Sequence, residues 1–102
     1  MKKAFLFCFA DDVGTADTVK DIVARLPQVA AWRYEMQHAI FLVSEYTANE
    51  LAHALSAQIP RKYFIITELS TDIDTSQGWV SKDTAYLIQN KALKPPEPKA
   101  IN

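Results

Sequence analysis

The sequence predicts one α+β domain with an antiparallel sheet, and three observations lead to this prediction. Four short runs rich in aromatic and β-branched residues are apolar on alternate positions or on both faces. Two segments between them have apolar residues at helical spacing, with turn or cap residues at their ends. The chain has 102 residues and a formal net charge of −1, which suits a single hydrophobic core.

Residues 3–10 predict a strand buried on both sides, because three phenylalanines on one face alternate with Leu6 and Cys8 on the other. The phenylalanines are Phe5, Phe7 and Phe9. Residues 11–15 then provide a turn and a helix N-cap. The apolar residues of the helix that follows are Val19, Ile22, Val23 and Leu26, and Pro27 ends it.

Residues 30–44 predict a hairpin of two strands with its turn at Gln37 and His38. In residues 30–36, large apolar side chains alternate with Arg33 and Glu35, which is typical of an edge strand with one solvated face. Residues 39–44 are apolar on both faces, so this strand is expected at the centre of the sheet.

The second half of the chain predicts a further helix and a further strand. Residues 47–50, Thr-Ala-Asn-Glu, have the form of a capping box, and the helix that they open ends at Pro60. Residues 62–69 predict a fourth strand with a mixed face, which favours the other edge of the sheet. After a polar link over residues 70–78, Ser81 caps a short third helix that extends to Gln89.

The element order is therefore βαββαβ with a C-terminal appendix. Right-handed crossovers place the first and third strands in the centre and both main helices on one face. This is a ferredoxin-like sandwich with a four-stranded antiparallel sheet. We assign residues 1–90 to this domain and residues 91–102, which hold three prolines and three lysines, to a flexible tail.

Two helices cover only one face of this sheet, although the central strands are apolar on both faces. A cover for the second face is therefore expected, since an exposed patch of this size is unusual in a monomer. Three covers remain open: the appendix with Trp79 and Tyr86, a second copy of the chain, or nucleic-acid bases stacked on aromatic residues. The residues expected at the dimer seam or partner face are Phe5, Phe7, Phe9 and Trp79.

Asp11 and Asp12 are the acidic residues best placed for chemistry, because they follow the end of the first strand. Adjacent carboxylates are able to hold Mg²⁺ or Mn²⁺ for phosphodiester cleavage, with Asp11 as the metal ligand. The alternative is that the two residues form a turn and favour the N-terminus of the next helix. We interpret His53 as a solvated helix residue and Cys8 as a core residue.

Several function classes find no support in the sequence. It contains no nucleophilic triad pattern, phosphate loop or dinucleotide fingerprint, and its two glycines exclude a glycine-rich cradle. The near-neutral charge argues against a strongly basic nucleic-acid surface. No apolar run is long enough to span a membrane, and the N-terminus is a poor signal peptide, so we expect a cytoplasmic protein.

Several landmarks resemble the small SinR-like proteins of the superfamily that contains VapD-type toxins and the small CRISPR-associated nuclease-like subunit. They are Trp32 and residues 39–43, 47–51, 64–69 and 78–80, within a similarity that covers roughly residues 3–88. The resemblance implies a ferredoxin-like homodimer joined by segments after the fourth strand and, in some relatives, metal-dependent cleavage or binding of RNA or DNA.

In nuclease relatives an Asp follows an aromatic residue directly at the end of the first strand. Here Phe9 is followed by Ala10 and only then by Asp11, and Asp12 is the fallback. Because one residue along a strand reverses the face of a side chain, this offset weighs against catalysis.

Three functions follow as hypotheses. The first is a homodimeric, non-catalytic module that interacts with protein or nucleic acid. The second is a divalent-metal-dependent endonuclease or endoribonuclease acting through Asp11. The third is a regulatory domain that binds a small molecule at the dimer seam.

Overall fold

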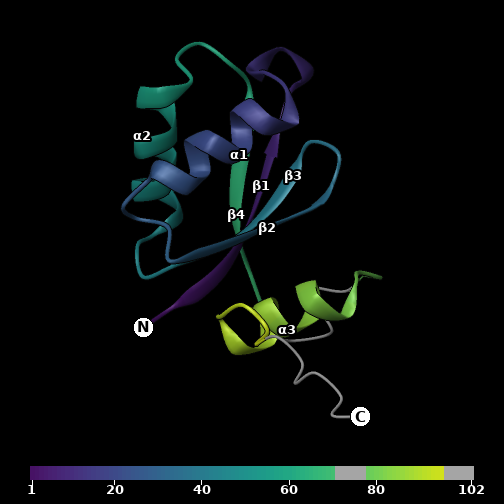
Figure 1. The fold of residues 1–102 in the computed structure, drawn as a ribbon. Coiled ribbons are helices and arrows are strands. Elements are labelled where there is room, and N and C mark those ends of the chain that lie inside the picture. Colours follow the sequence, from purple (N-terminus) through teal and green to yellow (C-terminus); the bar gives the residue numbers. More distant parts are fainter. Residues whose placement is uncertain (71–77, 96–102) are drawn as a thin grey trace.

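The computed structural model describes residues 1–70 and 78–95, which form four strands and three α-helices (Figure 1). The first unit contains β1 (Lys3–Phe9), a single 3₁₀ turn (Asp11–Val13), α1 (Ala16–Arg25) and β2 (Ala31–Met36). The second unit contains β3 (Ala39–Ser44), α2 (Ala48–Gln58) and β4 (Phe64–Leu69). The last element, α3, spans Lys82–Asn90.

The four strands form one sheet in the order β2-β3-β1-β4, and every neighbouring pair is antiparallel. From the other edge the order is β4-β1-β3-β2, with the first and third strands in the centre. The predicted α+β class and ferredoxin-like arrangement are therefore confirmed, including the hairpin of β2 and β3, whose turn holds His38 with a φ of 64°.

Side-chain caps begin all three helices at the predicted places. The hydroxyls of Thr15, Thr47 and Ser81 each accept a hydrogen bond from the backbone N–H three residues later. At α2 the carboxylate of Glu50 also accepts from the N–H of Thr47 at 3.1 Å, which completes the predicted capping box. These bonds satisfy backbone donors that have no partner within the helix.

The main core lies between the sheet and the pair α1 and α2. Phe5 and Phe7 of β1 are fully buried there, and Phe9 is nearly so. The side chains that pack on them from neighbouring strands and helices include Ile40, Leu42, Val19, Val23, Leu51 and Leu55. The amphipathic pattern of both helices thus positions them on the phenylalanine face of the sheet.

The opposite face of the sheet has its own smaller core beneath α3. Leu87 of α3 is fully buried in a cluster with Phe41 and Val43 of β3, and Leu6 and Leu69 pack at its border. Figure 1 shows α3 apart from α1 and α2, near the first residues of β1. The appendix therefore covers part of the second face, which was one of the three covers expected.

Parts of the predicted organisation lie outside the described residues. These are most of the polar link, at residues 71–77, and the end of the predicted tail, at residues 96–102. Within the described part of the chain, no helix is both long enough and apolar enough to cross a bilayer.

Replacement of Leu87 by Ala tests whether α3 belongs to the folded core. We expect Leu87→Ala to lower the free energy of unfolding by about 2–5 kcal/mol, because it leaves a cavity against β3. Urea denaturation measures this loss. The matched control, Gln89→Ala on the exposed side of α3, should change it by less than about 0.5 kcal/mol; equal effects would contradict a packed α3.

Candidate functional site

An apolar row crosses the second face of the sheet beyond the part that α3 covers. The register places Met36, Ala39, Cys8 and Ile65 side by side across β2, β3, β1 and β4. We call these four residues the open row. Met36 is 47% exposed and Ile65 63% exposed, whereas Ala39 is buried.

The open row ends at β4 in the most exposed apolar surface of the sheet. Tyr63, immediately before β4, is 85% exposed, and it lies on the same face as Ile65 because the two are two residues apart. Thr67 is also exposed on this face. Large exposed aromatic and β-branched side chains that lie together on a sheet are typical of an interaction surface.

β4 also has a free edge, since it pairs only with β1 among the described strands. The backbone N–H of Ala10 donates to the carbonyl of Tyr63 at 3.0 Å, so the odd-numbered residues of β4 direct their backbone groups toward β1. The N–H and C=O groups of Phe64, Ile66 and Glu68 consequently point away from the sheet, where a further strand is able to pair with them.

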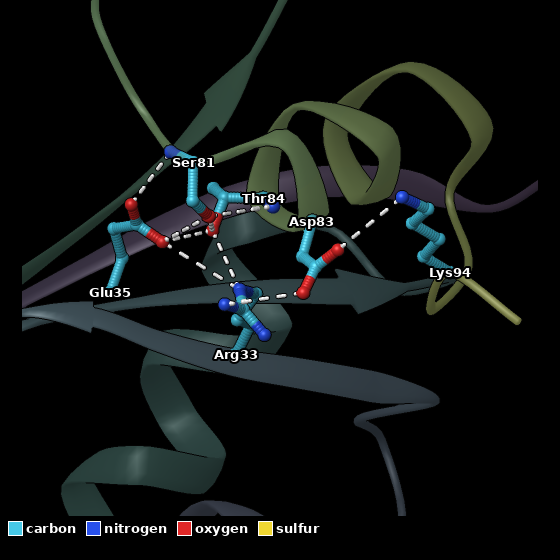
Figure 2. A network of polar contacts seen from close by, with 6 residues as sticks. All are labelled: Arg33, Glu35, Ser81, Asp83, Thr84 and Lys94. Carbon is cyan, nitrogen blue, oxygen red and sulfur yellow. Dashed lines mark hydrogen bonds and ion pairs between the residues drawn. The ribbon is translucent and has the colours of Figure 1, made fainter. Parts of the chain in front are cut away.

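A polar network, which we call the α3 clasp, fastens the N-terminus of α3 to β2 (Figure 2). Glu35 accepts hydrogen bonds from the N–H of Ser81 at 2.8 Å, from the Ser81 hydroxyl at 2.9 Å and from the Thr84 hydroxyl. Arg33 Nε donates to Thr84 Oγ1 at 2.9 Å, and its guanidinium lies 3.6 Å from Asp83. The carboxylate of Glu35 thus serves as a second cap of α3.

The clasp stabilises the ionised form of Glu35. Hydrogen bonds from Thr84 and then from the Ser81 backbone lower the pKa of Glu35, and the Arg33 guanidinium adds to this effect. Burial acts in the opposite direction but does not reverse the shift. Because the bonds of the clasp join α3 and its cap residue Ser81 to β2, the clasp acts in folding.

The predicted partner-face residues lie in two different environments. Phe5, Phe7 and Phe9 are buried under α1 and α2, so they belong to the core of this chain and a partner has to contact other residues. Trp79 is 99% exposed, directly before Val80, which packs against the α3 cluster. Trp79 therefore does not close the sheet within the described part of the chain.

The predicted acidic pair is exposed at the end of β1, and its two carboxylates contact two different side chains. Oδ1 of Asp11 lies 2.6 Å from Nε2 of His38, while Oδ2 of Asp12 lies 3.5 Å from Nζ of Lys62. Neither side chain caps α1, a role that Thr15 fills. Among the residues that the structure describes, no three acidic, histidine or cysteine residues gather in a way that would hold a metal ion.

Two further predictions concern single residues. His53 is exposed on α2, as expected. Cys8 was expected in the core, and the structure places it at intermediate exposure in the open row. The reason is that α3 covers the rows of Leu6 and Ala4 but does not extend to that of Cys8.

The edge position of β4 was predicted from the sequence and is confirmed, whereas the α3 clasp was missed. A signal for the clasp was present in Arg33 and Glu35, which share the face opposite Trp32 and Tyr34 and were interpreted as solvated. The sequence also indicates that the β4 edge is unprotected, because the run Tyr63–Thr67 has no charge, proline or glycine to block a further strand.

Comparison of the chain with protein-family models, with curated proteins and with solved structures found no match. The similarity to SinR-like and VapD-like proteins therefore stays a prediction from residue landmarks.

The lowered pKa of Glu35 predicts an acid-sensitive α3. The unfolded chain, with the ordinary pKa of 4.5, takes up the proton first, so the contribution of Glu35 is present above that pH and is lost as pH falls through the lowered pKa. We expect Glu35→Gln to lower the free energy of unfolding by about 1–3 kcal/mol at neutral pH.

Urea denaturation of both proteins from about pH 6 to about pH 3 measures this difference, which should shrink toward the acidic end. The control is Glu45→Gln, at an exposed position after β3. A difference between Glu35→Gln and the wild type that does not vary with pH would contradict the role of the ionised carboxylate.

Proposed function

We propose that the protein is a non-catalytic interaction module that forms homodimers through the β4 side of its sheet. The observation that carries this proposal is the exposed apolar surface of Tyr63 and Ile65, continuous with a strand edge whose backbone groups point away from the sheet. Apolar side chains supply the affinity of such an interface, and an open edge supplies directional hydrogen bonds.

Charge favours a protein partner over nucleic acid. Binding to a phosphate backbone depends on several lysines and arginines without anionic partners, and the chain has a net charge of −1. Near Tyr63, the cation of Lys62 already faces Asp12, and Asp11 adds a second exposed carboxylate at this end of the sheet.

The contacts of the acidic pair favour binding over the nuclease alternative. Asp11 and Asp12 lie next to each other in sequence, yet one faces His38 and the other Lys62. A divalent cation would have to displace both of these contacts before the two carboxylates acted together. Self-association needs neither residue.

A cytoplasmic location is part of this proposal. Cys8 is the only cysteine of the chain and lies partly exposed in the open row. A reducing compartment keeps such a thiol from forming disulfides between copies.

The solution mass tests the proposed function. Light scattering of the full chain over a range of concentrations should give twice the chain mass of 11.5 kDa. In the double variant Tyr63→Ser, Ile65→Thr we expect dimerisation to weaken by roughly tenfold or more, because apolar area at the interface is lost. Both residues are exposed, so the variant should fold.

Two control variants accompany this measurement. Tyr46→Ser removes a side chain that is 43% exposed after β3, at the far end of the sheet, and should leave dimerisation unchanged. The double variant Asp11→Ala, Asp12→Ala should also form a normal dimer. A wild-type monomer at all concentrations, or a dimer lost only in the aspartate variant, would refute the proposed function.

A further inference from the structure

We infer that a second copy binds by antiparallel pairing of its β4 with β4 of the first copy, so that the two Ile65 residues face each other at a two-fold axis. The two sheets then form one continuous sheet of eight strands. This inference rests on the proposed function and specifies which edge and which register the dimer uses.

The two edges of the sheet differ in their ability to accept a strand. At β2, the register shifts between Tyr34 and Met36 and leaves Glu35 without a strand partner, and charged Arg33 and Glu35 bind α3. Bulges and charges of this kind block edge pairing. At β4 the pairing with β1 is regular from Phe64 to Leu69, and no residue of the strand before Glu68 is charged.

The backbone of β4 has the alternation that this pairing needs. Phe64, Ile66 and Glu68 direct their N–H and C=O groups to the free edge, as the bond from Ala10 to Tyr63 establishes. When two Ile65 residues lie opposite each other, Phe64 of one copy falls opposite Ile66 of the other. Both members of that pair present outward backbone groups, so they are able to exchange hydrogen bonds.

The side chains are self-complementary in the same register. Lys62 lies two residues before β4, and continuing the strand alternation through Tyr63 puts it on the face of Phe64 and Ile66, opposite Glu68 of the other copy. Glu68 is exposed and makes no ion pair within residues 1–70 and 78–95, and Lys62 is 41% exposed beside Asp12. On the opposite face, Tyr63 of one copy lies beside Thr67 of the other, and the Ile65 residues of the two copies lie beside each other. Opposite charges and β-branched or aromatic pairs stabilise neighbouring strands.

Neighbouring registers lack this complementarity. A shift of one residue in each copy that centres the pairing on Ile66 keeps the backbone groups matched, but it places Phe64 opposite the carboxylate of Glu68. Centring on Phe64 instead places Lys62 opposite Ile66. Each shift removes both Lys62–Glu68 pairs and sets a charged group against an apolar side chain.

A two-fold pairing also closes the assembly. Each copy has one open β4 edge, and an isologous contact uses both of them. The edges left at the ends of the eight-stranded sheet are the two β2 strands, with the register shift and charges described above. The product is a dimer, with no free edge of the β4 type to extend a fibre.

Charge reversal tests the register. We expect Lys62→Glu and Glu68→Lys each to weaken dimerisation by on the order of tenfold, since each sets like charges opposite each other twice per dimer. The double variant should recover the wild-type affinity, and an equal mixture of the two single variants should form heterodimers. Asp12→Ala controls for the lost contact of Lys62. Unchanged dimerisation in both single variants would overturn the register.

Cysteine cross-linking tests the position of the axis independently. In a Cys8→Ala background, Ile65→Cys should give a disulfide-linked dimer on mild oxidation, because directly opposed residues of paired strands lie close enough to bridge. Thr67→Cys, also exposed on the same face, should not, since it lies opposite Tyr63. Cross-linking of Thr67→Cys alone, or of neither variant, would overturn the inference.

Amide exchange separates failure of this inference from failure of the proposed function. In the dimer, the N–H groups of Phe64, Ile66 and Glu68 should exchange at least about tenfold more slowly than in dilute monomer. Those of Ile65 and Thr67, bonded to β1, should be protected in both. A dimer with unprotected even-numbered amides would refute strand pairing and leave the interaction module standing, whereas a monomer at all concentrations would refute both.

Discussion

The fold depends on covering both faces of β1 and β3, whose side chains are apolar on each side. Phe5 and Phe7 on one face and Val43 on the other are fully buried, although only one face has the two main helices. Burial of such strands dominates the stability of a small domain. Whatever covers the second face is therefore part of the fold and also decides how much of the sheet remains for a partner.

The second face of the sheet has a covered part and an open part, because α3 is short and polar contacts at its N-terminus fix its position. Apolar contact through Leu87 alone would not define the position of a nine-residue helix along the strands. The α3 clasp defines it, since Glu35 binds both the N–H and the hydroxyl of the cap residue Ser81. Charge-assisted bonds depend strongly on geometry, so they fix where α3 lies and hence where the open row begins.

The strand and helix order was predictable because the period of apolar residues changes at strong turn and cap signals such as Thr47 and Pro60. The surface was only partly predictable. The apolar pattern on both faces of β1 was enough to predict that the second face needs a cover. Which phenylalanines lie under the helices was not predictable, because it depends on strand register and on the handedness of the connections. The contacts of Asp11 and Asp12 with His38 and Lys62 join loops that are distant in sequence, and no local pattern encodes them.

The two edge strands of the sheet differ in chemistry: β2 has charged side chains that bind α3, whereas β4 has exposed apolar side chains. The clasp engages Arg33 and Glu35 of β2 with α3, and the register shift between Tyr34 and Met36 makes this charged edge a poor site for a further strand. The open row runs from Met36 across the sheet and ends at Ile65 beside an unpaired backbone edge. A partner that buries Ile65 gains hydrogen bonds only when it approaches along β4, because β1 and β3 are paired on both sides and the edge strand β2 lies at the other end of the row. Apolar contact and hydrogen bonding therefore favour the same side of the molecule.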